Sequence, residues 1–272
     1  MKILDGRELA GYIQERQIRQ VRNLRQAYKV IPTLAIVQTT DNPVIDAYVR
    51  MKQAYGDEIL IEVVQHTVEQ SELAALVQAL NTDAGVHGII VQLPLTDPTE
   101  TDAIVNAIAP EKDVDGLGVD AQFTSATATA IDWLLAGYNV DLKAKRIAIV
   151  GLGRLVGAPL VKLWETTGYD LVTYDDTTAD LTSELREAQV IVTATGVPGL
   201  ITEQMLQPGA VVVDAGTATE GGKIVGDVAE SVREREDLTI TPVRGGVGPL
   251  TIAALFDNVI VAAKHVADTH ET

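Results

Sequence analysis

Residues 146–164 read RIAIVGLGRLVGAPLVKLW, an apolar run followed by a glycine-rich turn and the start of a helix. Gly151 and Gly153 match the first two glycines of the pattern G-x-G-x-x-G, whereas Val156 occupies the third position and Gly157 comes one residue late. Small residues let the backbone approach a pyrophosphate, whose charge then lies at a helix N-terminus. The stretch therefore predicts a strand, a turn and a helix that bind a dinucleotide, with a plain strand-to-helix turn as the alternative.

Two acidic residues follow the next predicted strand. Asp175 and Asp176 come directly after residues 170–174, 24 and 25 positions beyond Gly151. An acid at this point accepts hydrogen bonds from the adenosine ribose hydroxyls and repels a 2′-phosphate. The pair therefore favours NAD over NADP, while capping of the following loop is the alternative role for Asp176.

Short apolar runs alternate with segments of helical periodicity along the whole chain. The expected strands are residues 34–37, 59–64, 89–91, 146–150, 170–174, 189–193 and 210–214. The expected helices are one that bears Leu9, Ile13, Val21, Leu24 and Tyr28, one through Tyr48 and Lys52, one at residues 71–80 and one at residues 251–265. Because both faces of a parallel sheet must be buried, this alternation predicts an α/β fold with helix-covered parallel strands.

Composition limits the classes of function. The chain has 272 residues, enough for two modest domains, and its charge is 21 − 38 = −17, which disfavours nucleic acid and anionic membranes as partners. It has no cysteine, so disulfides, thiolate zinc sites and cysteine nucleophiles are excluded, and no metal site is expected. The N-terminus lacks the apolar core of a signal peptide, and no apolar run approaches the about 18 residues of a membrane span. We expect a cytoplasmic protein.

Four polar positions are candidates for a second site. Tyr48 and Lys52 are spaced i, i+4 and so lie on one helix face, although an ordinary surface pair has the same spacing. Gln92 follows the strand at residues 89–91, at the end where ligands bind in open parallel sheets. Asp115 lies in the turn-rich sequence KDVDG, in which Lys112 and Asp113 are expected to form a solvated loop pair.

The order of several motifs resembles that of a known enzyme family. The motifs are NPVIDAYVRMK, VHGIIVQLPL, PEKDVDG, GRLVGAP, GDV and TPVRGGVGPLT. They occur as in bifunctional methylenetetrahydrofolate dehydrogenase/cyclohydrolase, and the resemblance covers about residues 1–265. It implies a folate-binding catalytic domain at residues 1–120, completed by residues 250–272, and a Rossmann-like domain at residues 121–249. It also implies a cleft between the domains, a C-terminal helix that returns to the first domain, and a homodimer.

The resemblance also implies roles for individual residues. Lys52 is similar to the family's central catalytic lysine, Gln92 to the glutamine that hydrogen-bonds it, Tyr48 to the tyrosine that stacks on the folate, and Asp115 to the aspartate that holds the pterin edge. The loop that lines the folate and nicotinamide corresponds to Gly245, Gly246, Val247, Gly248, Pro249 and Thr251. The residues expected to bind the cofactor are Gly151, Gly153, Arg154, Leu155, Val156, Gly157, Asp175, Asp176, Thr195 and Gly196.

The two reactions of this family make different demands on the protein. Removal of a hydride from 5,10-methylene-tetrahydrofolate leaves a methenyl cation stabilised by its two flanking nitrogens, so this step chiefly needs alignment. Hydrolysis to 10-formyl-tetrahydrofolate needs an activated water and a protonated ring nitrogen. A lysine serves there only if its pKa falls toward neutrality. We therefore predict that Lys52 acts in hydrolysis with Gln92 as its partner.

The chain departs from the family pattern at the predicted cofactor site. Where the family has an arginine and a serine available to the NADP 2′-phosphate, this chain has Leu152 and Gly153. The family sequence C-H-S corresponds here to Tyr174, Asp175 and Asp176. An apolar and acidic set thus replaces a phosphate-binding one, which predicts NAD as the cofactor. A contribution of Arg154 to NADP binding is the alternative.

Other departures affect the folate side. SATATA replaces the family's P-C-T-P-x-G, Ile45 replaces a serine, and Arg244 replaces a proline beside the folate loop. A monofunctional dehydrogenase and a non-catalytic folate- or nucleotide-binding homologue are therefore alternatives to the bifunctional enzyme. Retention of Lys52 disfavours the binding protein. The acid-rich stretch GDVAESVREREDL, residues 226–238, is expected to form a solvated face, although Gly226 and Asp227 match the family.

Overall fold

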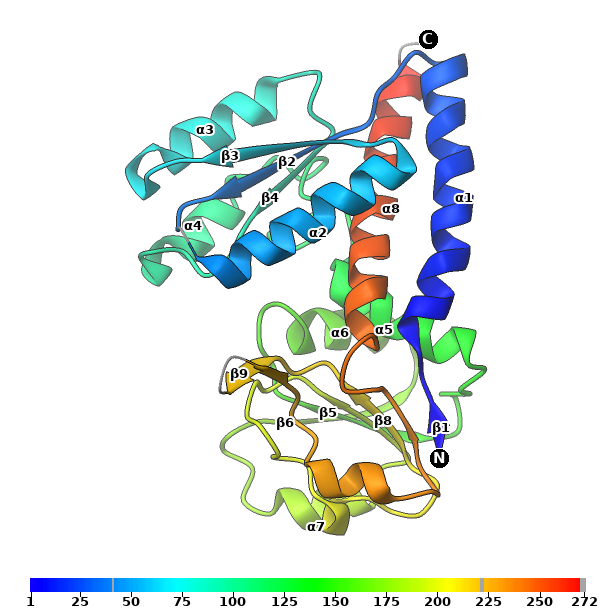
Figure 1. Ribbon diagram of the computed structural model, residues 1–272. Helices are drawn as coiled ribbons and strands as arrows, with labels where there is room; N and C mark the ends of the chain where they lie inside the picture. Colours follow the sequence, from blue (N-terminus) through cyan, green and yellow to red (C-terminus); the bar gives the residue numbers. More distant parts are fainter. Residues whose placement is uncertain (41, 221–222, 270–272) are drawn as a thin grey trace. The chain divides into compact units, whose positions relative to one another are not determined.

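The computed structural model describes residues 1–40, 42–220 and 223–269, which form two compact units (Figure 1). Unit 1 comprises Met1–Ala10 and Thr127–Thr251, and unit 2 comprises Gly11–Ala126 and Ile252–Thr272. Most of the C-terminal helix belongs to the unit of the first half of the chain, as predicted. The predicted first domain starts at residue 1, whereas Met1–Ala10 belong to unit 1 because strand β1 pairs there with β11.

Unit 1 is built on a six-stranded sheet in which all neighbouring strands are parallel, in the order β1-β11-β8-β7-β5-β6. Its strands are β1 (Lys2–Ile3), β5 (Arg146–Val150), β6 (Asp170–Tyr174), β7 (Val190–Thr193), β8 (Val211–Asp214) and β11 (Thr239–Ile240). The central strand β7 is buried at every residue, as expected of a parallel strand covered on both faces. The α/β fold with parallel strands is confirmed.

Short helices precede β5 or lie between the later strands of unit 1 (Figure 1). They are α5 (Ala126–Gly137), α6 (Gly157–Trp164), α7 (Leu181–Arg186) and the 3-10 helices η2 (Glu165–Thr167), η3 (Glu203–Met205) and η4 (Glu230–Glu234). Strands β9 (Ala218–Glu220) and β10 (Lys223–Val225) form a separate antiparallel pair. Ala148, Ile191, Val212 and Ile240 from four strands pack with Leu185 of α7 in one core.

Unit 2 contains a three-stranded parallel sheet in the order β3-β2-β4. Its strands are β2 (Thr33–Gln38), β3 (Glu62–Thr67) and β4 (Gly88–Val91). Its helices are α2 (Pro43–Ile59), α3 (Gln70–Thr82), η1 (Pro98–Glu100), α4 (Thr101–Val105) and the greater parts of α1 (Gly6–Ala27) and α8 (Val247–Thr269).

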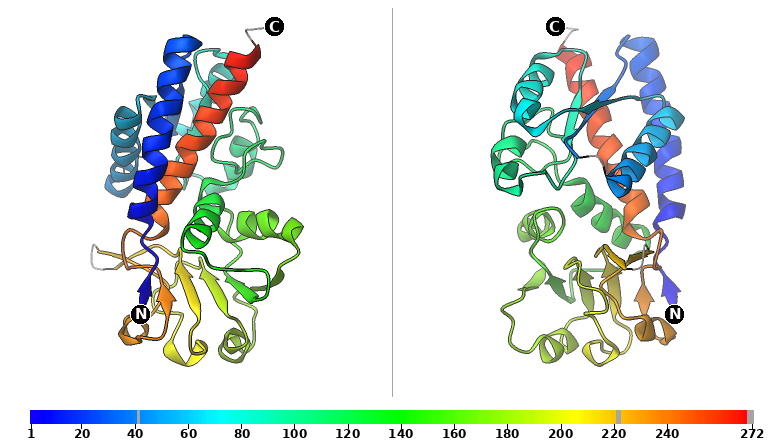
Figure 2. Two further views of the ribbon diagram at one scale, coloured as in Figure 1. Left: turned by 90° about the vertical axis from the view of Figure 1, so that its right-hand side faces the viewer. Right: turned by 60° about the vertical axis from the view of Figure 1, so that its left-hand side comes forward.

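Alternate residues of β4 mark the two faces of this sheet. Ile89 packs with Leu73 of α3 and Ile104 of α4 on one face. On the other face, a side chain at Gly88 would meet Val259 of α8 at 3.2 Å, so the glycine permits a close approach of helix and strand. Figure 2 shows α1 and α8 side by side along this unit, joined by the hydrogen bond from Gln17 Nε2 to Ala253 O (2.8 Å).

One strand prediction was wrong at its boundary. Residues 59–64 were expected to form a strand, but α2 continues to Ile59 and β3 starts only at Glu62. Leu60 adopts a left-handed conformation (φ 66°), and Ile61 N donates to Gly56 O (2.9 Å), which ends the helix. The intervening residues therefore belong to a helix cap. The other predicted strands lie within one residue of those observed.

Helix α8 is the one described helix that is long and apolar enough to cross a membrane, judged by length and composition alone. Fifty-six per cent of its most apolar window is buried inside the protein. The ring of Phe256 on α8 packs against that of Tyr55 on α2, tilted by 37° with 5.2 Å between the ring centroids. The apolar composition thus matches a helix that packs in the core of unit 2.

Candidate active site

Lys52 and Gln92, predicted from separate motifs, lie together in unit 2. Lys52 projects from α2, and Gln92 follows β4 directly, where its backbone N–H donates to Val37 O (2.8 Å) and continues the strand pairing. Lys52 Nζ donates a hydrogen bond to Gln92 Oε1. The carboxyl end of β4 thus brings an amide oxygen to the lysine, at the edge where open parallel sheets bind ligands.

Asp115 completes this group through its charge. Burial lowers the pKa of Lys52, and the carboxylate of Asp115 opposes that shift. Burial likewise raises the pKa of Asp115; the Lys52 ammonium opposes this shift, and the carboxylate of Asp113 adds to it. Desolvation is the largest effect on both groups, so each is biased toward its neutral form. Lys52 therefore loses its proton more readily than an exposed lysine does.

Tyr48 lies one helical turn before Lys52 on α2. Its side chain is 37% exposed, in contrast to the half-buried lysine. Residues four apart on a helix share a face, so the phenol ring and the ammonium are presented on the same side of α2. An accessible aromatic ring beside a polar group is suited to stacking on a planar ligand.

Asp113 organises the loop that carries Asp115, which corrects the expectation of a solvated pair. Its side chain is only 2% exposed, with Oδ1 accepting from Gly116 N (3.0 Å) and Oδ2 from Gly118 N (2.7 Å). The alternating charges of this segment do not reveal that the carboxylate is turned inward. Lys112 is also engaged, because its Nζ donates to Leu80 O (2.9 Å) and Asp83 O at the C-terminus of α3.

The loop around Asp115 closes on itself with little spare room. Gly116 has φ 69°, and a side chain there would meet Phe123 O at 2.6 Å. Ile89 pairs with Asp113 in an isolated parallel bridge beside β4. Gln92 and Asp115 therefore follow two adjacent parallel segments, which explains how residues 23 positions apart in the sequence reach one site.

In unit 1, the predicted glycine turn connects β5 to α6. Gly151 has φ 88°, a conformation that favours glycine, and α6 begins at Gly157. A side chain at Gly157 would lie 1.8 Å from Gly151 O. Gly157, one residue late in the sequence pattern, is thus the residue that allows the helix to pack against the turn. Gly153 has open space around it.

The other predicted residues of the turn are accessible or belong to the start of α6. Arg154 is exposed, and the Leu155 side chain is 48% exposed. Val156 precedes the helix and donates its N–H to Gly153 O (3.3 Å). An open turn with exposed apolar side chains and a helix N-terminus has the features that a bound dinucleotide needs, and the residues present fit such a cofactor.

The loop after β7 lies directly against the glycine turn. A side chain at Gly151 would meet Ala194 O at 2.7 Å and the Thr195 Cγ2 atom at 2.9 Å. Thr195 Oγ1 accepts from Val197 N (3.1 Å), and Gly196 has φ 70°. Thr195 and Gly196, both predicted cofactor ligands, are thereby placed beside the turn that carries Gly151.

The two acids after β6 differ in their environments. Asp175 Oδ1 accepts from Thr177 N (3.0 Å) and Thr177 Oγ1 (2.6 Å), and these hydrogen bonds lower the pKa of Asp175. Asp175 therefore caps the following loop, a role that the sequence suggested for Asp176. Both side chains are exposed, so both present negative charge at the end of β6.

The predicted folate loop precedes α8 in unit 1. Gly245 has φ 91° and accepts at its O from Gly6 N (2.9 Å). The guanidinium of Arg7 lies over it, since a side chain at Gly245 would meet Arg7 Cζ at 2.4 Å. A side chain at Gly246 would meet Thr241 Cβ at 2.9 Å, so this loop is packed closely on one side.

The remaining loop residues form the first turn of α8. Val247 is its first residue, Gly248 faces open space where a side chain would begin, and Pro249 lies where a helix does not need an N–H donor. Thr251 Oγ1 donates to Val247 O (3.3 Å). Arg244, just before this loop, is exposed.

Sequence reasoning missed a pair of buried carboxylates in unit 1. Asp214 ends β8, and Asp227 lies in the stretch expected to form a solvated face, yet Asp227 is 0% exposed. Val232 of the same stretch is also fully buried. The family motif GDV was the one signal at this position. Burial raises the pKa of Asp214, which hydrogen bonds from the Asp227 and Val228 N–H groups oppose.

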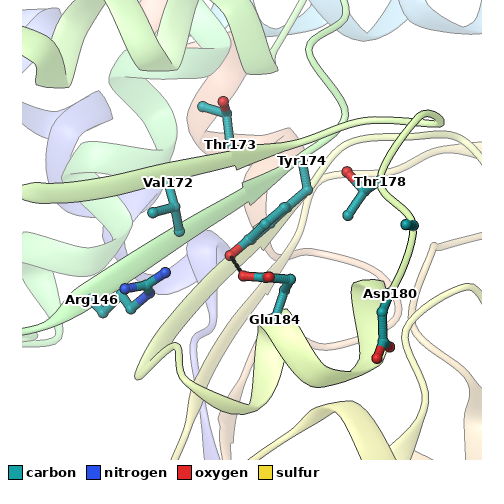
Figure 3. Close-up of a pocket in the computed structure, with 8 residues that line it drawn as sticks. Arg146, Val172, Thr173, Tyr174, Thr178, Asp180 and Glu184 are labelled. Atoms are coloured by element: carbon teal, nitrogen blue, oxygen red, sulfur yellow. Dashed lines mark hydrogen bonds between the residues drawn. The ribbon is translucent and has the colours of Figure 1, made fainter.

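A pocket of about 540 Å³ opens beside β6 and α7 (Figure 3). Its lining residues are Arg146, Val172, Thr173, Tyr174, Thr178, Ala179, Asp180 and Glu184. Inside it, Tyr174 Oη donates to Glu184 Oε2 (2.8 Å). The pocket includes none of the predicted cofactor or folate residues, although Asp175 follows Tyr174 immediately in the chain.

Comparison with known proteins covers nearly the whole chain. Residues 4–115 match the family model of the tetrahydrofolate dehydrogenase/cyclohydrolase catalytic domain, and residues 125–267 match that of its NAD(P)-binding domain. A Sulfurovum protein named Bifunctional protein FolD is 34% identical, with 98% of this chain and 100% of that protein aligned.

Solved structures give the same result. The bifunctional enzyme FolD of Campylobacter jejuni, a methylenetetrahydrofolate dehydrogenase/cyclohydrolase, superposes with a TM-score of 0.92 at 35% identity, covering 97% of this chain and 99% of that one. The dehydrogenase-cyclohydrolase of Trypanosoma brucei, solved with NADP and an inhibitor, gives 0.89 at 30% identity and covers 97% of each chain. On these matches, the chain belongs to the tetrahydrofolate dehydrogenase/cyclohydrolase family.

Proposed function

We propose that this protein oxidises 5,10-methylene-tetrahydrofolate to 5,10-methenyl-tetrahydrofolate and then hydrolyses the product to 10-formyl-tetrahydrofolate. The observation that carries the proposal is the group of Lys52, Gln92 and Asp115, in which a lysine whose pKa is lowered by burial donates to an amide oxygen. A protein that only binds folate or nucleotide has no need of such a lysine. Family membership supports both activities.

The hydrolytic step uses the lysine as a proton carrier. Water adds to the methenyl carbon and loses its first proton. As the bond from that carbon to N5 breaks, the hydroxyl loses its remaining proton to form the formyl carbonyl and N5 gains a proton, so one proton is released overall. Neutral Lys52 accepts the proton from water, and Gln92 fixes the direction of the amine. Because the methenyl substrate is a cation, its binding favours the neutral lysine still further.

The oxidation relies on alignment by both predicted binding loops. When bound, the nicotinamide cofactor accepts the hydride from the methylene carbon. The chain's own part is to hold the cofactor with the turn from Gly151 to Gly157 and the folate with Tyr48 and Asp115. No proton transfer to a side chain is required in this step, so it tolerates changes at Lys52 better than hydrolysis does.

An absorbance assay tests the proposed function. The purified protein, given methylene-tetrahydrofolate and NAD⁺ or NADP⁺, is expected to generate the methenyl absorbance and then remove it faster than buffer alone. Appearance without accelerated decay would indicate a monofunctional dehydrogenase. Failure of the absorbance to appear with either cofactor would contradict the proposal and leave a binding protein.

We further propose that NAD is used in preference to NADP. Asp175 and Asp176 place two exposed carboxylates after β6, and such acids repel a 2′-phosphate. The related T. brucei enzyme was solved with NADP, so membership of the family does not decide the cofactor. The ratio of kcat/KM for NAD⁺ to that for NADP⁺ tests this point, and a ratio of one or less would contradict it.

A charge-neutral variant sharpens the cofactor test. Asp175→Asn keeps an oxygen for the Thr177 hydrogen bonds and removes the charge, so we expect the preference for NAD⁺ to fall about tenfold, equal to about 1.4 kcal/mol. Glu165→Gln removes an exposed charge elsewhere in unit 1 and is expected to leave the ratio unchanged.

The resemblance also leads us to propose a homodimer. Light scattering after size-exclusion chromatography is expected to give about 58 kDa, which is twice the chain mass of 29.1 kDa. A mass near 29 kDa at micromolar concentration would contradict this assembly.

A further inference from the structure

We propose that Asp227 is a positioning residue of the cofactor site, whose buried carboxylate holds the loop after β7 against the glycine turn at Gly151. Asp227 does not touch the cofactor; it acts through Thr195. The proposal rests on the proposed function only for the identity of the ligand, a nicotinamide dinucleotide.

The contacts of Asp227 converge on the end of β7. Its Oδ2 atom accepts from Thr193 Oγ1 (2.6 Å) and from Thr195 N (2.7 Å). Thr193 is the last residue of β7, and Thr195 is the second residue after it. One carboxylate oxygen therefore fixes both the strand end and the first turn of the loop. Hydrogen bonds to a charged acceptor are the stronger kind.

Thr195 passes this constraint to the glycine turn. Its Cγ2 atom and Ala194 O lie so close to Gly151 that a side chain at the glycine would overlap both. The loop then turns at Gly196, and Val197 presents a 51% exposed apolar side chain. Displacement of Thr195 would thus change the wall of the turn that is expected to receive the cofactor.

Asp214 holds Asp227 from the other side. Asp214 Oδ1 accepts from Asp227 N (3.0 Å) and Gly216 N (3.2 Å), and its Oδ2 accepts from Val228 N (3.2 Å). Arg233 Nη2 lies 3.3 Å from Asp214 Oδ2. The carboxyl ends of β7 and β8 are thus joined through two buried carboxylates, at the sheet edge where ligands bind.

The energetic cost of Asp227 argues for a role beyond packing. Burial of a charged carboxylate is strongly unfavourable unless its oxygens are satisfied. Within the part of the chain that the structure describes, Asp227 Oδ1 has no hydrogen-bond partner. It faces Gly216, where any side chain would lie 1.9 Å from it. An apolar residue would fill the space at lower cost, but it would not hold Thr195.

Two substitutions at residue 227 distinguish loss of the hydrogen-bond acceptor from loss of its charge alone. Asp227→Ala removes the acceptor for Thr193 and Thr195. Asp227→Asn keeps one oxygen in the Oδ2 position and places its amide where Oδ1 has no partner among the described residues. Thr193→Val removes one donor and leaves the carboxylate, which provides a milder variant should Asp227→Ala fold poorly.

A matched control removes a structural carboxylate from the same unit. Asp132 on α5 accepts a hydrogen bond from Trp164 Nε1 (2.9 Å). Trp164 is not one of the residues predicted to bind the cofactor. Asp132→Ala is expected to lower the melting temperature without changing the affinity for NADH. Cyclohydrolase activity on added methenyl-tetrahydrofolate, which needs no cofactor, provides an internal control in every variant.

NADH fluorescence titration and amide hydrogen exchange test the proposal. We expect Asp227→Ala to weaken NADH binding at least tenfold and to speed exchange at the Thr195 amide, with cyclohydrolase activity within twofold of wild type. Asp227→Asn is expected to stay within about threefold for NADH, and Thr193→Val to lie between the two. Asp227→Ala loses both hydrogen bonds and Thr193→Val loses one, whereas Asp227→Asn keeps an acceptor oxygen and loses only its charge.

Two results would overturn the positioning role. The first is that Asp227→Ala keeps the wild-type affinity for NADH and the wild-type rate of amide exchange at Thr195, while its melting temperature falls only as much as that of Asp132→Ala. The second is Asp227→Asn as damaging as Asp227→Ala. Hydrogen exchange at Thr195 needs neither folate nor cofactor, so it remains decisive even if the protein lacks the proposed activity.

Discussion

Each unit contains a group of buried ionisable side chains, and the two groups differ in the partners to which they hydrogen-bond. In unit 2, Lys52 faces Gln92 and Asp115, and its side chain donates to another side chain. In unit 1, Asp214 and Asp227 accept mainly from backbone N–H groups of the segments after β7, β8 and β10. In the first arrangement burial makes the lysine easier to deprotonate, whereas in the second the carboxylates fix backbone segments in place.

The difference suits two tasks: one group adjusts the pKa of a side chain, and the other fixes the backbone of loops. A lysine that must change protonation needs partners that adjust its pKa without neutralising it permanently. Loops that bind a cofactor need fixed backbone positions, which carboxylates accepting several N–H groups provide. We therefore expect changes in unit 2 to alter pH dependence and turnover, and changes in unit 1 to alter stability and cofactor affinity.

The largest effect on stability is expected for Asp214→Ala. The substitution leaves the guanidinium of Arg233 without its carboxylate and removes acceptors from three backbone N–H groups. Removal of one partner of a buried ion pair typically costs about 3–5 kcal/mol, and we expect a loss of this size in the free energy of unfolding measured with urea.

A surface ion pair provides the control for that experiment. Asp237→Ala breaks the contact of Asp237 with Arg235, which is 2.6 Å long and exposed on the aspartate side. We expect a much smaller change in unfolding free energy there. Equal losses of unfolding free energy in Asp214→Ala and Asp237→Ala would mean that the buried ion pair stabilises the fold no more than the surface ion pair does.

Asp113→Ala tests whether unit 2 also uses a carboxylate for geometry. The change deprives Gly116 and Gly118 of their acceptor and releases the loop that carries Asp115. We expect unfolding free energy to fall by about 2–3 kcal/mol and hydrolysis to slow. Asp120→Ala, an exposed acid on the same loop, should stay within about 0.5 kcal/mol. Wild-type hydrolysis in Asp113→Ala would refute the anchoring role.

Gln92→Glu probes the movable proton. A second carboxylate beside Lys52 raises the pKa of the lysine, so more alkaline solution is needed to produce the neutral amine. The rising limb of the pH–rate profile for hydrolysis is expected to move to higher pH. Gln53→Glu adds the same charge at the neighbouring position of α2 and is expected to move it less. An unmoved profile in Gln92→Glu contradicts a titrating lysine.

The smallest predicted effect concerns His87, a buried residue with no part in either site. Burial lowers its pKa, the Lys112 ammonium lowers it further, and Asp83 and a hydrogen bond to Gly85 oppose the shift. His87 Nδ1 accepts from Thr33 N (3.2 Å), a contact that the protonated ring would lose.

The sign of the pH dependence follows from this shift. The unfolded chain binds a proton at His87 near pH 6.5, before the folded protein does, so stability falls as pH drops below about 6.5. Urea unfolding between about pH 7.5 and about pH 5.5 should reveal the decline. His87→Gln, which retains an acceptor for Thr33, should flatten it; an equally steep decline in that variant would assign it to other groups.

Most strands were predicted well from the sequence because buried parallel strands appear as short apolar runs. Strands β5 and β6 have the predicted bounds to the residue. In β5 an apolar run, residues 147–150, is buried, and in β6 the apolar pair Leu171 and Val172 lies at the centre of a strand bounded by turn residues. The helix end at Ile59 was missed, because the left-handed conformation of Leu60 depends on how the chain enters β3 and has no glycine to mark it.

The candidate site was predicted only in part from the residues themselves. The resemblance named Lys52, Gln92 and Asp115, but spacing alone could not place them together, because their contacts depend on parallel segments far apart in the chain. Asp113 and Asp227 were expected to be solvated, since charge in a sequence suggests exposure. Their burial depends on backbone N–H groups that only the folded loops bring to them.

The most direct test of the role of Lys52 compares both activities in Lys52→Met. We predict that hydrolysis of methenyl-tetrahydrofolate falls at least about 100-fold, the usual contribution of a general acid–base group. Oxidation of methylene-tetrahydrofolate should fall by no more than about tenfold, because alignment by the loops remains. Wild-type hydrolysis in this variant, or equal loss of both activities, would contradict the assignment of the movable proton to Lys52.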